Sequence, residues 1–204
     1  EMKKLLDRIF IDGLGGMAQG LFATLIIGTI IQQIGLFMGG GTGDLIYELG
    51  KIAAGLTGAG IGVGVARKLE AGHLVIVSAA VVGMIGAFAG KILSGQVLVD
   101  GNLVLAGPGE PLGAFAAAYL AIEIGILISG KTKLDIILTP LVCIGTGSAV
   151  GLFVGPPISE FMLWLGSLIN WGTEQQPFLM GIVVSVLMGM ILTLPISSAA
   201  LGVI

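Results

Sequence analysis

Two glutamates stand in an otherwise apolar part of the chain. Glu110 lies in a glycine- and proline-rich loop at 107–111, and Glu123 lies near the middle of the apolar segment 112–129. A charged side chain at membrane depth costs roughly 2.5–3.5 kcal/mol on insertion scales, so such a residue usually marks a binding site or a pathway. Carboxylate oxygens can accept hydrogen bonds from a polar solute or bind a cation, and a dry, unpaired carboxylate tends to take up a proton. We therefore take Glu110 and Glu123 as candidate solute-binding residues.

Both glutamates also have structural explanations, which the sequence leaves open. Glu110 precedes Pro111, a residue typical of the first position of a helix, and its carboxylate would face the positive end of the helix dipole. Glu123 could instead pair with a charge on a neighbouring helix. Gln32 and Asn170 are two further candidates for solute binding, although their amides could equally serve helix packing.

The remaining reactive side chains give no case for catalysis. His73 and Cys143 are the only residues of their kinds, which is too few for a zinc site. Residues 130–132 read Gly-Lys-Thr, as in part of a phosphate loop, but the upstream glycine spacing and the preceding strand are missing. We expect no catalytic residue, no cofactor and no metal ion. The net charge of −3 and the lack of a dense basic patch argue against nucleic acid as a partner.

Composition places these residues in a lipid bilayer. The chain is 55% hydrophobic and only 10% charged, against about 25% charged residues in an ordinary soluble domain. Too few charges are present to cover a water-facing surface, so an integral membrane protein is indicated. Glycine accounts for 36 of the 204 residues, and small residues let membrane helices pack closely. The small-residue faces also favour a homo-oligomer.

Hydropathy predicts an all-α, polytopic fold in a single transmembrane domain over 1–204. About six spans are expected, at 13–37, 45–66, 74–93, 112–129, 134–154 and 178–201. The second is so rich in glycine that we expect it to be tightly packed or partly unwound, because glycine lowers helix propensity by up to about 1 kcal/mol relative to alanine.

Two stretches that connect the expected spans have sequence patterns that predict local structure. Apolar runs at 97–99 and 103–105 flank Asp-Gly-Asn and predict a small hairpin. Residues 155–157, Gly-Pro-Pro, are expected to end the fifth helix. Residues 158–171 would then form a separate helix, too short to cross a core of about 30 Å, and we expect it to be interfacial or re-entrant.

Basic residues predict the orientation of the chain. Seven of the nine lie on one side of the expected topology, which makes the N-terminus cytoplasmic. These are Lys3, Lys4, Arg8, Arg67, Lys68, Lys131 and Lys133.

The last span echoes the first one. Residues 181–189 repeat the pattern of residues 20–28, and the number of spans between them would give the second copy the opposite orientation. We expect an inverted repeat whose second half is mostly absent, in a chain shortened at its C-terminal end.

Several motifs resemble a known family. Gly-Glu-Pro-x-Gly-Ala at 109–114, Ala-Ile-Glu-Ile-Gly at 121–125 and Gly-Leu-Phe-Val-Gly-Pro-Pro at 151–157 are similar to bacterial membrane proteins of the phosphotransferase-system enzyme IIC-like family, including the perfringolysin regulator type. The resemblance implies a multi-pass, permease-like protein of the bacterial inner membrane. It also implies separate cytoplasmic phosphotransferase components as partners, with this chain at most the membrane subunit of a phosphorylating enzyme.

Together these features predict translocation of a small polar solute, with a sugar suggested by the resemblance. The solute would lie near the middle of the membrane, between Glu110, Glu123 and the glycine-rich second span. Two alternatives stay open, namely a membrane-embedded sensor or regulator that binds a ligand without moving it, and a channel.

Overall fold

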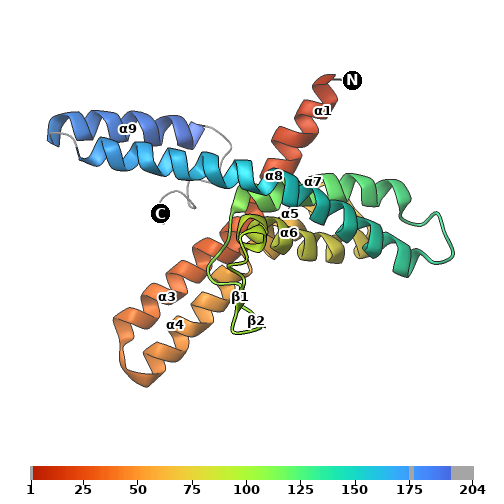
Figure 1. The fold of residues 1–204 in the computed structure, drawn as a ribbon, viewed down its shortest axis with the longest axis horizontal. Coiled ribbons are helices and arrows are strands. Elements are labelled where there is room, and N and C mark those ends of the chain that lie inside the picture. The colour runs from red at the N-terminus through yellow and green to blue at the C-terminus, as the bar shows by residue number, and fades with distance from the viewer. Residues whose placement is uncertain (1, 175–176, 194–204) are drawn as a thin grey trace.

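The computed structural model describes residues 2–174 and 177–193, which are almost entirely helical (Figure 1). The first part of the chain is one continuous helix with two π-helical stretches: α1 (Met2–Asp7), η1 (Arg8–Gly13), α2 (Leu14–Leu21), η2 (Phe22–Ile26) and α3 (Ile27–Met38). The elements that follow are α4 (Gly40–Gly55), α5 (Thr57–Lys68), α6 (His73–Leu93), β1 (Leu98–Val99), β2 (Asn102–Leu103), α7 (Pro111–Ile128), α8 (Asp135–Thr173) and α9 (Pro177–Thr193).

The lengths and hydropathies of these helices confirm an all-α, polytopic membrane protein. Four helices are long and apolar enough to cross a bilayer: Met2–Met38, α6, α7 and α8. The pair α4 and α5 makes a fifth if the two are counted as one bent span. The expected last span, 178–201, coincides with α9 as far as Thr193, and the rest of it lies outside the described residues.

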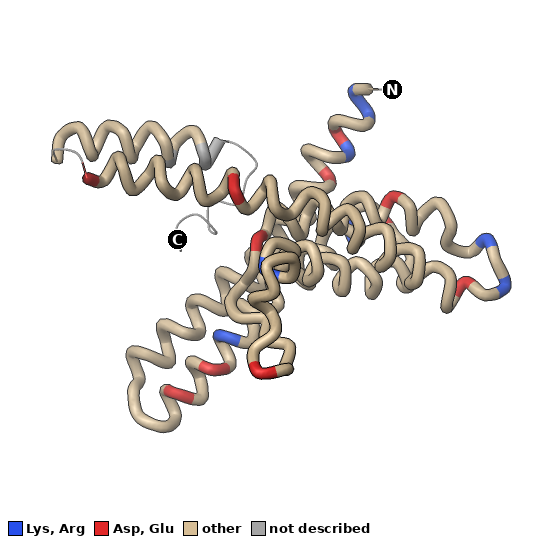
Figure 2. Tube along the Cα trace, in the orientation of Figure 1, with Lys and Arg blue, Asp and Glu red and all other residues tan. Residues whose placement is uncertain are grey.

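The described residues form a packed body from which two helical hairpins and the N-terminal helix α1 project (Figure 1). In Figure 1, α5, α6, α7 and the first part of α8 lie side by side, while α3 with α4, and the end of α8 with α9, extend away from them. The fully buried side chains belong to the body and include Ile61, Val75, Phe88 and Ile122. Charged residues fall mainly at turns and helix ends, and the helices between them are largely uncharged (Figure 2).

Glycines allow the helix backbones to touch. A Cβ atom added to Gly16 of α2 would lie 2.5 Å from the carbonyl oxygen of Gly64 in α5. In the α3–α4 hairpin, a Cβ atom on Gly28 would lie 2.6 Å from the backbone nitrogen of Ala54. Distances below 3.0 Å are incompatible with a real Cβ atom unless the backbone moves. The high glycine content is therefore used for close helix packing, as the sequence predicts.

The glycine-rich second span is both bent and tightly packed. Helices α4 and α5 meet at Leu56 with an angle of 49°. The hydroxyl of Thr57, which is buried, donates a hydrogen bond to the carbonyl oxygen of Ala54 at 2.6 Å and so satisfies one acceptor at the break. Just beyond it, a Cβ atom on Gly58 would lie 2.6 Å from the carbonyl oxygen of Gly83 in α6.

The expectation that residues 155–157 end a helix is wrong. Helix α8 continues through Pro156 and Pro157 to Thr173. Each proline removes a backbone donor, at a cost of about 3 kcal/mol or more in a helix interior, but its fixed φ angle suits a helix. Gly155 packs against α6, where an added Cβ atom would lie 2.6 Å from the Cβ atom of Ala89, and we attribute the continuity to this tertiary packing. Residues 158–171 are thus the second part of α8 and not a separate helix.

The predicted hairpin is present but shorter than expected. Strands β1 and β2 pair antiparallel, with Leu98 opposite Leu103 and Val99 opposite Asn102. The backbone N–H of Val104 also donates to the carbonyl oxygen of Val97 at 2.8 Å. The hairpin lies in the connection between α6 and α7, ahead of the loop that carries Glu110.

Substituting Gly62 with alanine should destabilise the protein, because the new Cβ atom would meet the carbonyl oxygen of Ala79 in α6. Overpacking of this kind costs about 1–3 kcal/mol. The matched control is Gly145→Ala in α8, where a Cβ atom meets open space and alanine should be neutral or stabilising. Thermal unfolding in detergent compares the two variants. Equal stabilities would contradict the close α5–α6 packing.

Candidate functional site

A cavity of about 760 Å³ lies between the end of α6, the connection 94–110 and the second part of α8. Backbone and small side chains make up much of its wall, and polar side chains from all three elements line it. The polar side chains are Lys91, Ser94, Gln96, Glu110, Ser159, Glu160, Ser167 and Asn170. Two of the four predicted solute-binding residues, Glu110 and Asn170, therefore line the same cavity.

One face of α8 supplies the wall opposite Glu110. Ser159, Leu163, Ser167 and Asn170 recur at spacings of three or four residues, so they lie along one side of the helix. This arrangement depends on the helix continuing past its two prolines. Near the start of this face, the hydroxyl of Ser159 lies close to α6, 3.0 Å from where a Cβ atom on Gly90 would be.

Backbone contacts with α6 place Glu110 at the cavity. Its N–H donates to the carbonyl oxygen of Ala87 at 2.7 Å, and its own carbonyl oxygen accepts from Ala114 at 3.0 Å, which starts α7. Gly109 has a φ angle of +72°, and a Cβ atom on it would lie 2.8 Å from the carbonyl oxygen of Ala87. Only glycine fits here, because of both the conformation and the close approach. Pro111 begins the helix, as the sequence predicts.

The Glu110 carboxyl group is only partly satisfied. Its Oε1 atom is buried and has no hydrogen-bond partner among the described residues. Burial raises the pKa of the Glu110 carboxyl, and the nearby backbone N–H of Leu112 acts in the opposite direction with a smaller effect. A buried acceptor without a donor is costly, so a ligand that brings a hydroxyl or ammonium donor would remove this penalty.

Lys91 connects α6 with the loop. Its Nζ atom donates to the carbonyl oxygen of Ala106 at 3.3 Å and lies 5.6 Å from the centroid of the Phe88 ring. The lysine thus contacts the start of the loop whose end carries Glu110.

Glu123 lies away from the cavity and pairs with Arg8. The Nε atom of Arg8 donates to Oε1 of Glu123 at 2.6 Å, and Nη2 donates to Oε2 at 3.3 Å. The two side chains are 38% and 30% exposed, so the pair is only partly shielded. Phe115 and Tyr119 pack against one another nearby on α7, with ring centroids 5.8 Å apart. The sequence leaves two roles open for Glu123, solute binding and pairing with a charge on a neighbouring helix. In the structure Glu123 forms the ion pair.

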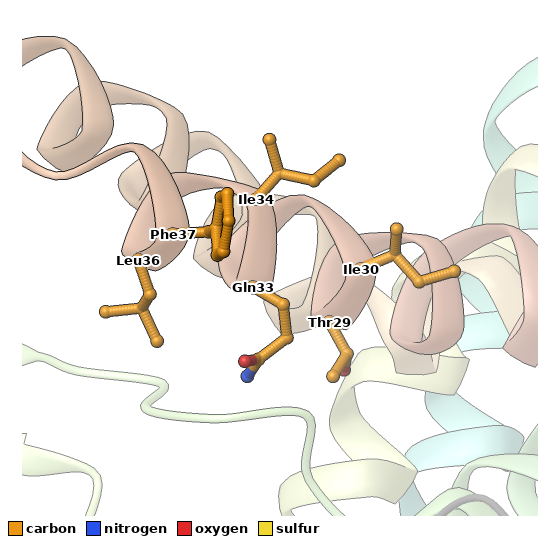
Figure 3. A pocket seen from close by; sticks show the side chains of 6 residues that line it. All are labelled: Thr29, Ile30, Gln33, Ile34, Leu36 and Phe37. Atoms are coloured by element: carbon orange, nitrogen blue, oxygen red, sulfur yellow. The ribbon is translucent and has the colours of Figure 1, made fainter.

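Gln32 also lies outside the cavity. It packs in the α3–α4 hairpin, where a Cβ atom on Gly50 would lie 2.7 Å from its Cγ atom. The adjacent Gln33 lines a shallow, mostly apolar depression along α3 (Figure 3). The other residues of this depression are Thr29, Ile30, Ile34, Leu36 and Phe37, all from one helix. The structure therefore does not bring Glu123 or Gln32 together with Glu110 and Asn170.

Comparison with known families assigns the chain to one of them. The family described as "Phosphotransferase system, EIIC" matches residues 11–204, and the chain belongs to it. It is thus a multi-pass membrane transport component of the sugar phosphotransferase system. No curated protein and no solved structure matches the chain.

Three features of the site escape the sequence-based interpretation. From the sequence, Arg8 serves only to predict orientation, and nothing in the local pattern indicates its ion pair with Glu123, which is distant in the sequence. The polar residues of α8 all fall within the separate helix expected at 158–171, but only the continuity of α8 through 155–157 shows that they lie opposite Glu110. Lys91 is an isolated cation near a helix end, and only the fold shows its contact with Ala106.

Breaking the ion pair should measurably destabilise the protein. Glu123→Gln leaves Arg8 without its charged partner, and hydrogen bonds to charged groups contribute about 1.5–3 kcal/mol. The exchange Arg8→Glu with Glu123→Arg should recover most of the loss. In the control, Glu48→Gln breaks the exposed pair with Lys51, whose atoms are 3.6 Å apart, and should cost less than about 1 kcal/mol. Thermal unfolding that ranks Glu48→Gln as more harmful would contradict a stabilising role for the Arg8–Glu123 pair.

The stability contributed by Glu110 should depend on pH. Because burial raises the pKa of Glu110, its contribution is present when the carboxyl is protonated and is lost as pH rises through the raised pKa. Glu110→Gln mimics the protonated form, so without ligand it should match the wild type at low pH and be more stable near neutral pH. Melting temperatures of both proteins across a pH series test this, and parallel curves would disprove it.

Proposed function

We propose that this transport component holds a sugar in the cavity between α6, the connection 94–110 and α8, with Glu110 as its main hydrogen-bonding residue. The observation that carries the proposal is the buried Oε1 atom of Glu110, which has no hydrogen-bond partner in the described part of the chain. A sugar hydroxyl would supply the missing donor. The sugar would then cross the bacterial inner membrane and be phosphorylated with the help of separate cytoplasmic components.

The dimensions and chemistry of the cavity support this choice. Its volume of about 760 Å³ falls within the usual range for small-molecule sites, about 300–1,000 Å³. The amide of Asn170 and the hydroxyl of Ser159 offer both donors and acceptors to a ring of hydroxyl groups. The hydroxyl of Ser167 donates to the carbonyl oxygen of Trp164 at 2.7 Å, so it offers a sugar only an acceptor. Gln32 would have no contact with a sugar held here, and we assign it to the α3–α4 hairpin.

The topology predicted from basic residues would place this cavity toward the outside. It lies at the C-terminal end of α6 and the N-terminal end of α7, opposite the ends that carry Arg67, Lys68, Lys131 and Lys133. The bend between α4 and α5 is close to the same region, since a Cβ atom on Gly55 would lie 4.0 Å from the carbonyl oxygen of Gly107. Broken helices at the binding site are common in transporters that alternate their access.

In this proposal Glu123 does not contact the sugar in the conformation described. Its pairing with Arg8 holds the first helix against α7. It would join the translocation pathway only in a conformation where the first helix has moved and the pair has separated. A homo-oligomer remains part of the proposal, and the small-residue helix faces support it.

Loss of the Glu110 charge should impair sugar handling. Glu110→Gln should lower the phosphorylation of labelled hexoses by membrane vesicles supplied with the cytoplasmic components and phosphoenolpyruvate, about 10- to 100-fold, because a charge-assisted hydrogen bond contributes about 1.5–3 kcal/mol. Glu48→Gln, which removes an exposed carboxylate on α4, is the control and should retain activity. Unchanged activity in Glu110→Gln would rule out its proposed role.

Proteoliposomes separate transport from the two alternatives. A carrier gives saturable counterflow of labelled hexose, a sensor gives binding without counterflow, and a channel gives flux that does not saturate. We expect saturable counterflow. Tight binding with no exchange of internal for external sugar would favour the sensor.

A further inference from the structure

We propose that Lys91 is a positioning residue for Glu110, which it places by clamping the loop 106–110 onto α6. The lysine does not need to touch a solute for this role. The inference rests on the proposed function only in taking Glu110 as the residue that contacts a solute, since the clamp itself is a feature of the fold.

The loop is held at both of its ends by the same face of α6. At its start, the Nζ atom of Lys91 donates to the carbonyl oxygen of Ala106. At its end, the N–H of Glu110 donates to the carbonyl oxygen of Ala87. Residues 87 and 91 are four apart in a helix and therefore neighbours on one face. The two contacts fix the loop at a pair of points one helical turn apart.

Between these two contacts the backbone has little support of its own. Gly107 and Gly109 both have positive φ angles, +82° and +72°, and glycines leave a chain conformationally free. A Cβ atom on Gly107 would meet nothing within 4 Å. Without the Lys91 contact, the hydrogen bond that holds the loop to α6 among the described residues would be that of Glu110 with Ala87, beside the close approach of Gly109. The direction of the Glu110 side chain would then be less restricted.

Two further contacts favour the position of this exposed lysine at the end of α6. Its Nζ atom lies over the ring of Phe88, a fully buried side chain in the same helix, and cations are attracted to the face of an aromatic ring. The backbone N–H of Gln96 donates to the carbonyl oxygen of Lys91 at 3.0 Å, which ties the end of α6 to the connection that follows.

The carbodiimide dicyclohexylcarbodiimide tests the clamp without any solute. It modifies protonated carboxyl groups in apolar surroundings, and mass spectrometry locates the adduct on Glu110 in native membranes. The charged residues that line the cavity are Lys91 from α6, Glu110 itself and Glu160 from α8. In the wild type, labelling of Glu110 should follow a titration whose midpoint lies above the ordinary pKa of a glutamate, because burial raises the pKa.

The direction of the change in Lys91→Met distinguishes the two roles that the lysine could have. If Lys91 clamps the loop, Glu110 gains access to water, its midpoint moves to lower pH, and labelling near neutral pH falls severalfold. If Lys91 acts only through its charge, loss of a nearby cation raises the midpoint instead. Lys91→Arg, which keeps a donor at the end of a long side chain, should restore most of the wild-type titration.

Lys51→Met is the matched control. Lys51 is likewise exposed and lies 5.8 Å from the centroid of an aromatic ring, that of Tyr47, but it is on α4 and outside the cavity. The Lys51→Met substitution should leave the midpoint of Glu110 labelling unchanged. An unchanged or raised midpoint in Lys91→Met, or a lowered midpoint in Lys51→Met, overturns the proposal. Because labelling is done in membranes, a variant that does not survive extraction is still measured.

Protection of wild-type Glu110 by glucose, mannose or galactose addresses the proposed function separately. If none of these hexoses slows labelling while Lys91→Met still lowers the midpoint, the clamp stands and the sugar assignment for these probes fails. If a hexose protects Glu110 equally well in the wild type and in Lys91→Met, the lysine is not a positioning residue.

Discussion

Close approach between helix backbones is the constraint on which the rest of this structure depends. Lipid provides little hydrophobic driving force between helices, so packing must come from surfaces that fit without large side chains. At Gly16, Gly58 and Gly62 the facing carbonyl groups occupy the space where a Cβ atom would be. Helices α6 and α7 meet in the same way, since a Cβ atom on Gly86 would lie 2.6 Å from the carbonyl oxygen of Gly113. This packing places the start of α7 close to α6, where Ala87 accepts a hydrogen bond from Glu110.

The candidate site is a consequence of the same packing. Its walls are helix ends and loop backbone, and its specific chemistry comes from a few side chains added to that frame. Glu110 is held through backbone hydrogen bonds while one of its carboxylate oxygens stays without a donor among the described residues. The glutamate within α7, Glu123, is paired with Arg8. Two carboxylates on or next to the same helix thus have opposite states, one available to a ligand and one engaged in holding two helices together.

Local patterns predict the membrane class, the hairpin at 98–103 and the start of α7 at Pro111. These features depend on hydropathy and turn chemistry, which act over a few residues. The pairing of Arg8 with Glu123 depends on tertiary packing between segments far apart in the chain, and no local pattern encodes it. The continuity of α8 was missed for a related reason. Proline lowers helix stability locally, and tertiary contacts such as that of Gly155 with α6 outweigh this preference.

The length of α8 has a mechanical consequence. With 39 residues and a rise of 1.5 Å per residue it extends about 58 Å, nearly twice the thickness of a hydrocarbon core. One half packs in the body and the other half carries both the wall of the cavity and α9 (Figure 1). A rod of this kind acts as a lever: a small tilt about the glycine contacts near its centre would swing Asn170 and α9 through a much larger arc. Opening of the cavity and displacement of the hairpin formed by the end of α8 and α9 would then be a single movement.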